Sequence, residues 1–263
     1  SEMCIRDREY VVLSNCDVVT NIDFNAALQQ HIDTEADITI IYSKGFYSKE
    51  KNPSTNVISV DENHTVKEVL ITPAITGECN VSLEMFIMRT EFLKKIVQEA
   101  ASKSQHSLVR DVLQGRKDEF VIKGYEHKGV FTKIDGLAAY YQANLSLLQA
   151  DTRAGLFQES APIYTKVGDN APVKYGLESS VKNSLIADGC VIEGSVENCV
   201  LFRGVRIGKD AVVKNSVLMQ GTHVGEKCNI ERVIADKNVD ISSDKVLTGS
   251  DDFPLYLSKN GKI

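Results

Sequence analysis

The chain has 263 residues and a formal net charge of −6, from 30 basic and 36 acidic side chains. This length suffices for two domains with sizeable hydrophobic cores. Because the basic residues form no block, nucleic acid is not an expected partner. No apolar run reaches the roughly 18 residues that a membrane span requires, and no charged-then-apolar leader opens the sequence, so we expect a cytoplasmic protein without a membrane partner.

The cysteines of this chain include no CxxC pair. Three of them fall among aliphatic residues near the C-terminus, where Cys190 has the same phase as Ile207 and Val224. Reduced cysteines used as small apolar residues are therefore expected, in place of disulfides or a metal site. The cysteines are Cys4, Cys16, Cys79, Cys190, Cys199 and Cys228.

The first part of the chain has the pattern of an α/β domain. Residues 10–13 and 36–42 are apolar runs typical of buried strands. Between them, residues 24–31 have the i, i+3, i+4, i+7 spacing of a helix, capped by Asn21 or Asp23. The order strand, helix, strand predicts a βαβ unit of a mainly parallel sheet.

Asp17 follows the first predicted strand and so lies at its carboxyl end. Open α/β sheets bind ligands at that edge, and a carboxylate there suits a divalent cation that bridges phosphates. A solvated turn residue or a helix cap explains Asp17 equally well. This position alone therefore does not decide between a metal ligand and a structural role.

Further elements complete the N-terminal part. Residues 57–60 and 66–71 flank a polar turn and predict a hairpin, and residues 120–125 predict a strand. Three polar residues are expected to cap helices, namely Thr90, Ser107 and Asp135. The helix after Asp135 carries Tyr140 and Tyr141 on its apolar stripe, and we expect this pair in the core rather than as a stacking platform.

A repeat dominates the C-terminal part of the chain. Val196, Val213 and Ile230 recur at one fixed spacing, and glycines separate the apolar positions. This pattern predicts a solenoid in which each coil has three short strands with one apolar side chain facing a shared core. An amphipathic helix is excluded because each glycine costs about 1 kcal/mol in a helix. A hairpin-rich sandwich would need longer alternating strands.

The predicted domain organisation follows from these patterns. Residues 1–150 form the α/β domain, and residues 179–263 form the solenoid. Residues 151–178, with Pro162, Gly168 and Pro172, carry no long period and are expected to be a linker.

The whole chain resembles the central and C-terminal parts of ADP-glucose pyrophosphorylases (glucose-1-phosphate adenylyltransferases), and in particular the regulatory D-type subunits of bacterial glycogen synthesis. The resemblance is carried by residues 14–24, 60–73 and 140–145 and by the Asn-Ser-Val-Leu steps of the solenoid. It implies a partial, Rossmann-like nucleotidyltransferase domain followed by a left-handed parallel β-helix of hexapeptide repeats that assembles oligomers.

The resemblance also implies a reaction. The family transfers AMP from ATP to glucose 1-phosphate and releases pyrophosphate. Such a transfer depends on positioning and charge neutralisation, with Mg²⁺ held by two carboxylates, basic side chains on the phosphates and a Gly-rich loop around the nucleotide. That loop belongs upstream of the position of Asp17, and no segment of this type precedes Tyr10 in the sequence given.

Individual positions carry over as follows. Asp17 matches the family's metal-binding Asp, Asp23 matches the next Asp, and Ser82 matches a serine that catalytic subunits place near the sugar. Thr72 stands where catalytic subunits have a lysine on the sugar phosphate, and a hydroxyl supplies no cation there. Lys133 stands where they have the second metal-binding Asp, and an ammonium at that position would repel Mg²⁺.

Three hypotheses follow. We favour a non-catalytic regulatory subunit that pairs with a catalytic homologue, as a hetero-oligomer such as a tetramer, or with itself through the β-helix. Thr72 and Lys133 separate it from an active adenylyltransferase completed by further N-terminal residues. The third hypothesis, a hexapeptide acyltransferase, would use His223 as general base, but its phase predicts a surface histidine. The resemblance implies Mg²⁺ and ATP as cofactors, whereas Thr72 and Lys133 argue against their binding by this chain. Glucose 1-phosphate or a sugar nucleotide is a candidate ligand.

Overall fold

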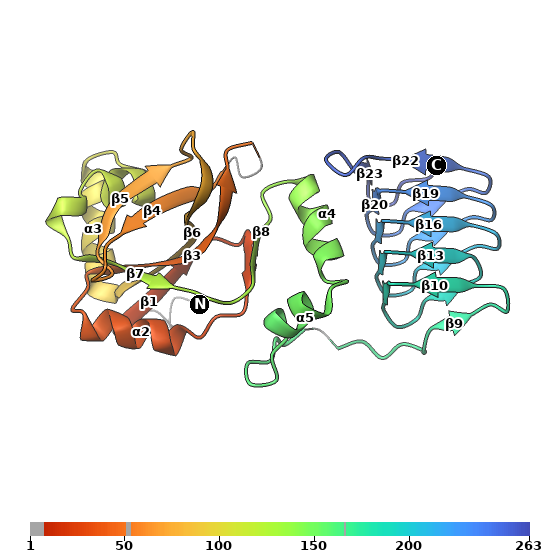
Figure 1. Cartoon of the computed structure of the whole chain (residues 1–263), viewed down its shortest axis with the longest axis horizontal. Helices are drawn as coiled ribbons and strands as arrows, with labels where there is room; N and C mark the ends of the chain where they lie inside the picture. Colours follow the sequence, from red (N-terminus) through yellow and green to blue (C-terminus); the bar gives the residue numbers. More distant parts are fainter. Residues whose placement is uncertain (1–7, 51–53, 166) are drawn as a thin grey trace. The chain divides into compact units, whose positions relative to one another are not determined.

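The computed structural model describes residues 8–50, 54–165 and 167–263. The chain forms two compact units, Ser1–Asp135 and Gly136–Ile263 (Figure 1). The sequence analysis set the domain boundary at residue 150, whereas the structural boundary falls between Asp135 and Gly136. The physical reason is that the helix α4 (Leu137–Ser146) packs against the solenoid, so it belongs to the second unit.

The first unit is built on a six-stranded sheet with the order β5-β4-β6-β3-β7, in which β1 also pairs with β6. The strands are β1 (Tyr10–Ser14), β3 (Ile38–Ser48), β4 (Asn56–Val60), β5 (Val66–Ile71), β6 (Thr76–Arg89) and β7 (Ile122–Glu126). β3 and β7 are parallel, whereas β6 runs antiparallel to β1, β3 and β4. The α/β class is confirmed, but the sheet is mixed rather than mainly parallel, because the long strand β6 lies between β1 and β3.

Helices and a small second sheet complete the first unit. They are α2 (Phe24–Asp33), α3 (Thr90–Ser102), the π-helix η1 (Leu108–Gln114), the 3-10 helix η2 (Lys117–Glu119) and the antiparallel pair β2 (Val18–Thr20) and β8 (Phe131–Lys133). The hairpin of β4 and β5 is confirmed.

Two of the predicted helix caps are present and two are not. Asp23 caps α2 by accepting a hydrogen bond from the Asn25 amide, and Ser107 caps η1. Thr90 is the first residue of α3, and its hydroxyl donates to the carbonyl of Arg8, so the predicted cap is wrong. Asp135 does not cap α4, because Gly136 occupies the N-cap position and the Asp135 carboxylate accepts from the Ser54 hydroxyl at 3.1 Å.

The second unit is a parallel β-solenoid, as predicted (Figure 1). One of its sheets contains β10 (Ser180–Lys182), β13 (Ser195–Glu197), β16 (Val212–Lys214), β19 (Asn229–Glu231) and β22 (Val246–Thr248). A second contains β11 (Leu185–Ile186), β14 (Val200–Leu201), β17 (Val217–Leu218), β20 (Val233–Ala235) and β23 (Leu255–Leu257). The third contains β9 (Lys174–Tyr175), β12 (Val191–Ile192), β15 (Arg206–Ile207), β18 (His223–Val224) and β21 (Asp240–Ile241).

The solenoid begins before the predicted residue 179, because β9 already pairs with β12. The predicted linker also contains a short helix, α5 (Ala150–Leu156). The predicted phases are observed in the ladders: Val196 pairs with Val213, and Val213 pairs with Ile230. All three side chains are fully buried.

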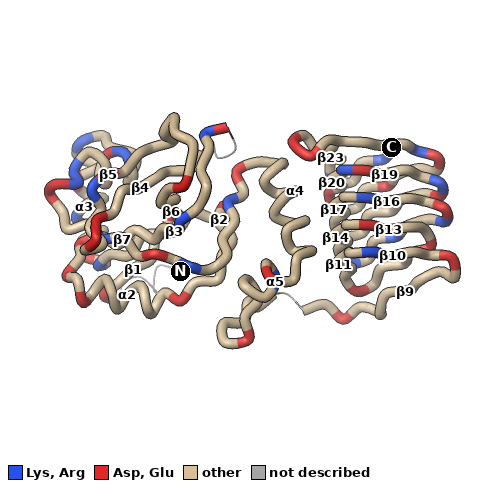
Figure 2. The backbone as a smooth tube through the Cα atoms, viewed as in Figure 1, with Lys and Arg blue, Asp and Glu red and all other residues tan. Residues whose placement is uncertain are grey.

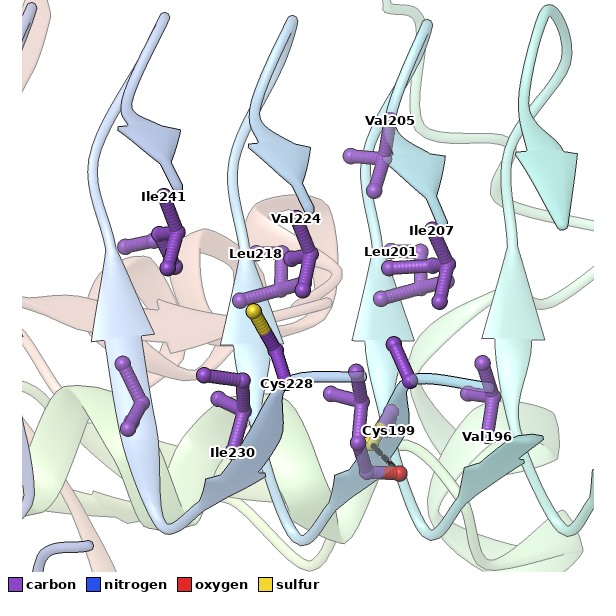
Figure 3. Close-up of a cluster of buried hydrophobic side chains, with 14 of the residues drawn as sticks. Val196, Cys199, Leu201, Val205, Ile207, Leu218, Val224, Cys228, Ile230 and Ile241 are labelled. Carbon is purple, nitrogen blue, oxygen red and sulfur yellow. Dashed lines mark hydrogen bonds between the residues drawn. The ribbon is translucent and has the colours of Figure 1, made fainter. Parts of the chain in front are cut away.

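The solenoid core is continuous along the coils (Figure 3). Figure 3 shows Leu218, Val224 and Ile230 from neighbouring strands pointing into the same interior, with Cys199 and Cys228 among them. Cys190, Cys199 and Cys228 are buried free thiols, and burial raises the pKa of Cys199 to about 12. These three cysteines therefore act as small apolar residues, whereas Cys16 is exposed, Cys79 is half-buried and Cys4 lies outside the described residues.

Helix α4 covers part of one solenoid sheet. Tyr141 is fully buried against Val200, Val217 and Ile234, and its hydroxyl donates to the carbonyl of Asn215 at 2.6 Å. Burial raises the pKa of Tyr141 to about 12. The expectation that this tyrosine belongs to a core is confirmed.

Candidate functional site

The candidate site lies where the middle of β6 loses its neighbour on one edge. β1 pairs with residues 85–89 of β6, and β4 pairs with Asn80 and Val81. Ser82, Leu83 and Glu84 therefore pair with neither strand, and we call these three residues the β6 gap. On the opposite edge the register to β3 shifts, because Ile41 pairs with Met85 and Tyr42 with Ser82. A bulge of this kind redirects side chains and leaves backbone groups open to other partners.

The backbone at the gap is strained at one residue. Glu84 has φ of 56° and is the one non-glycine residue with positive φ inside a described strand. Residues held in this region cost of order 1–3 kcal/mol and persist where the surrounding structure determines them. Here the backbone N–H of Asn15, just after β1, donates to the backbone carbonyl of Glu84 at 3.2 Å. The Glu84 amide donates to the Ser82 hydroxyl at 3.2 Å.

The side chain of Glu84 enters a chain of polar contacts. The Asn56 amide donates to one carboxylate oxygen at 2.5 Å, and the Asn15 amide donates to the other at 3.4 Å. The Thr72 backbone N–H donates to the Asn56 side-chain carbonyl at 3.3 Å. Thr72 also has positive φ, at 42°, which is unusual for a β-branched residue. The two strained residues are thus joined through Asn56.

Asp17 and Lys133 meet beside this chain of contacts. Antiparallel pairing of β2 with β8 places Val18 opposite Lys133, and the Ile134 amide donates to the Asp17 carbonyl at 2.7 Å. As a result, the Lys133 ammonium lies 3.8 Å from the Asp17 carboxylate. It also donates to the Ser54 carbonyl at 2.7 Å. The Lys133 side chain is only 8% exposed, so its charge is directed inward.

The electrostatics connect both groups. Burial raises the pKa of the Glu84 carboxyl, and the charge of Asp17 raises it further. The ammonium of Lys133 and the hydrogen bond from Asn56 act in the opposite direction. Two carboxyl groups and one ammonium therefore share this part of the unit, and the single cation belongs to a protein side chain.

The structure brings together four of the positions singled out in the sequence. Asp17, Lys133, Thr72 and Ser82 all reach this site, whereas Asp23 caps α2 instead. The sequence analysis missed three further residues, namely Glu84, Asn56 and Asn15. One signal for Glu84 was present, because it is a lone charge within the apolar run of residues 81–88.

A divalent cation does not fit the residues that are present. Asp17 offers one carboxylate, and one of its oxygens is buried without a hydrogen-bond partner. The position facing it is occupied by the ammonium of Lys133. In the part of the chain that the structure describes, no three His, Cys, Asp or Glu side chains converge into a metal-binding group. Mg²⁺ prefers several oxygen ligands and is repelled by a neighbouring ammonium.

Other candidates are weaker. His223 is 51% exposed in its side chain and pairs with Asp240 at 2.9 Å on the outer surface of the solenoid. A cavity of about 440 Å³ in the first unit is lined by Ser43, Lys44, Glu126, His127, Lys128, Gly129, Val130 and Phe131. Two of its charged residues, Lys44 and Glu126, pair with each other at 3.1 Å. Basic and acidic residues are interspersed along the solenoid turns (Figure 2).

The C-terminal part of the chain matches a known family, and most of the chain is similar to known proteins. Residues 171–252 match the family described as GlmU-like, C-terminal hexapeptide. The chain is 34% identical to the glycogen biosynthesis protein GlgD of Bacillus subtilis, over 96% of this chain and 63% of the relative. It is 36% identical to GlgD of Geobacillus stearothermophilus, over 80% of this chain and 51% of the relative. It is 28% identical to the glucose-1-phosphate adenylyltransferase of Bacillus mycoides, over 91% of this chain and 64% of the relative.

The chain is similar to glucose-1-phosphate adenylyltransferases over most of its length, and its solenoid matches a hexapeptide-repeat family. It is also similar to proteins named glycogen biosynthesis protein GlgD. The chain spans less than two thirds of the length of each of these relatives. No helix within the described ranges is long and apolar enough to cross a membrane.

Proposed function

We propose that the chain is part of a regulatory, non-catalytic subunit of a cytoplasmic glucose-1-phosphate adenylyltransferase that acts in glycogen synthesis. The observation that carries the proposal is the ion pair of Lys133 with Asp17. In the resemblance described above, both positions belong to carboxylates that hold Mg²⁺. An internal ammonium neutralises the remaining carboxylate and leaves no anionic ligand set for the metal.

Thr72 supports the same proposal from the phosphate side. Transfer of AMP to glucose 1-phosphate requires positive charge on the phosphates, because the transition state spreads negative charge over phosphoryl oxygens. Thr72 offers a hydroxyl and a backbone N–H, and that N–H donates to Asn56. Without a cation at this position and without a metal site, the charge neutralisation on which the reaction depends is lost.

What such a chain retains is a scaffold for assembly. The first unit has an ordered sheet, and the second is a solenoid with a continuous apolar core. We infer that the protein pairs with a catalytic homologue through the solenoid, as a hetero-tetramer, and changes the homologue's activity. An active enzyme completed by residues outside this chain is the second candidate, and it requires Lys133 to be compatible with the reaction.

The first experiment separates these two candidates. The full-length protein and its catalytic homologue are purified separately, and pyrophosphate release from ATP and glucose 1-phosphate is measured for each protein and for the mixture. We expect turnover near background for the protein alone and a higher rate, or a changed response to effectors, for the mixture than for the catalytic homologue alone. Robust turnover by this protein on its own would contradict the proposal.

The second experiment restores the missing charges. The double variant Thr72→Lys/Lys133→Asp should create or raise activity, because it supplies a phosphate-binding cation and a second carboxylate. The matched control is Thr72→Asn/Lys133→Asn, which removes the original side chains without adding either charge. Lys and Asn both lack the β-branch of Thr72, so neither double variant adds strain at the positive φ of position 72. Equal activity in both double variants would count against the site assignment.

A further inference from the structure

Glu84 reaches the candidate site only because the strand is irregular there. The bulge on the β3 edge and the missing pairing on the other edge let its backbone adopt φ of 56°. Glycine adopts this conformation freely because it has no side chain, whereas glutamate does not. Glu84 is nonetheless only 6% exposed, and both of its carboxylate oxygens accept hydrogen bonds. The strain therefore keeps a carboxylate inside the site.

The same carboxylate occupies the amide donors that line the site. Asn56 and Asn15 both direct their side-chain N–H groups at Glu84, and Asn56 also accepts from the backbone of Thr72. Glu84 thus connects the position of the missing phosphate-binding cation with the Lys133–Asp17 pair. An anionic ligand entering here would have to displace a hydrogen-bonded carboxylate and would meet its charge in a poorly solvated place.

We propose that Glu84 is a specificity-determining residue that keeps phosphorylated ligands out of this site, independently of Thr72 and Lys133. The inference rests on the proposed function, because the excluded ligand class is the sugar phosphate of that reaction. It extends the proposed function, because the site is then inactive for two reasons: the charged ligands are missing, and the Glu84 carboxylate fills the place of the phosphate. Restoring Thr72 and Lys133 to charged ligands leaves the carboxylate in place, so full restoration also requires a change at Glu84.

The test measures binding of glucose 1-phosphate by isothermal titration calorimetry to full-length protein. The Thr72→Lys/Lys133→Asp variant is compared with the same variant carrying Glu84→Gln or Glu84→Gly. Glu84→Gln removes only the charge and can still accept from Asn56, whereas Glu84→Gly also removes the side chain and the strain. We expect binding to be about tenfold tighter with Gln, as for removal of a like charge near a phosphate, and tighter again with Gly.

Glu68→Gln in the same background is the matched control, because Glu68 is an exposed carboxylate on β5. It should leave the affinity unchanged. Equal affinity in the double variant and in both Glu84 variants, including no binding by any of them, would overturn the inference. Thermal unfolding of each protein shows whether a variant is folded. This experiment measures ligand binding and does not involve the catalytic homologue. The inference about Glu84 can therefore fail while the regulatory role stands, and the regulatory role can fail while the inference stands.

Discussion

Left-handed backbone occurs in both the solenoid and the candidate site, and in the described solenoid it falls on Asn, Asp and Gly except at Lys227 and Arg232. Three successive solenoid corners carry Asn183, Asn198 and Asn215, and the side-chain amides of Asn183 and Asn198 each donate to the asparagine of the next coil. Asn adopts this conformation at low cost. In the candidate site the left-handed residues are Thr72 and Glu84, one β-branched and one a buried acid.

The difference concerns how far sequence and fold agree. In the solenoid, the corner residues, the apolar phases and the parallel ladders all favour the same structure, which is typical of repeat proteins. In the candidate site, the residue types oppose the backbone that they adopt, and a lysine takes a place expected for a carboxylate. Such local conflict is retained where it serves a function. The predictions below test whether the two regions differ in this way.

The largest effect is expected from a cavity in the solenoid core. Leu218 is fully buried there, and Leu218→Ala should lower the free energy of unfolding by about 2–5 kcal/mol, from lost burial and the cavity left behind. Chemical denaturation followed by circular dichroism measures the change. Val246→Ala is the control, since Val246 is 70% exposed, and it should shift the stability by less than about 0.5 kcal/mol. Similar losses in both variants would show that the coils are not closely packed.

The next effect should come from the ion pair of the candidate site. Lys133→Met removes the ammonium beside Asp17 and Glu84 and the hydrogen bond to the Ser54 carbonyl. We expect a loss of about 1–3 kcal/mol, below that of a fully buried pair because Asp17 is 30% exposed. The control is Lys44→Met, whose exposed pair with Glu126 should contribute about 0–1 kcal/mol. A Lys133 variant as stable as its control would mean that the pair is a solvated contact.

The contrast between the regions also explains what the sequence could predict. The solenoid was predictable to the register of Val196, Val213 and Ile230, because its pairing partners are one coil apart and repeat. The βαβ order was predictable from local pattern. The place of β6 between β1 and β3 was not, because those partners are distant in sequence.

For the candidate site, the sequence showed which residues stand at the functional positions of the family, but it did not predict which of them contact each other. Asp17, Thr72, Ser82 and Lys133 were singled out by resemblance, and they do lie at one site. Glu84 was missed because a single charge in an apolar strand has no period, and its conformation depends on a bulge that only strand pairing creates. Asp135 resembled a helix cap, but its tertiary contact with Ser54 decides its position.

The corner asparagines permit a direct test of backbone strain. Asn198→Ala removes the amide contacts and places an alanine at φ of 53°, which should cost about 1–2 kcal/mol. Asn198→Gly removes the same contacts but adopts the conformation freely, so it should cost clearly less. Denaturant unfolding of the two variants gives the strain by difference. If alanine and glycine were equally destabilising, the amide ladder rather than the backbone would determine the corners.

The smallest effect concerns the pH dependence of stability. Burial raises the pKa of Glu84 above its ordinary value of 4.5, Lys133 lowers this pKa and Asp17 raises it. The Glu84 carboxyl group therefore keeps its proton to higher pH in the folded state than in the unfolded state. The free energy of unfolding should therefore fall as pH rises above 4.5 and level off above the folded pKa. Glu84→Gln lacks this proton, so the stability of the native protein relative to the variant should decline over that window. Denaturant unfolding from about pH 4 to about pH 8 measures the difference, with Glu68→Gln as the exposed control, and a flat or rising difference would show that the Glu84 carboxylate is well solvated or fully compensated by Lys133.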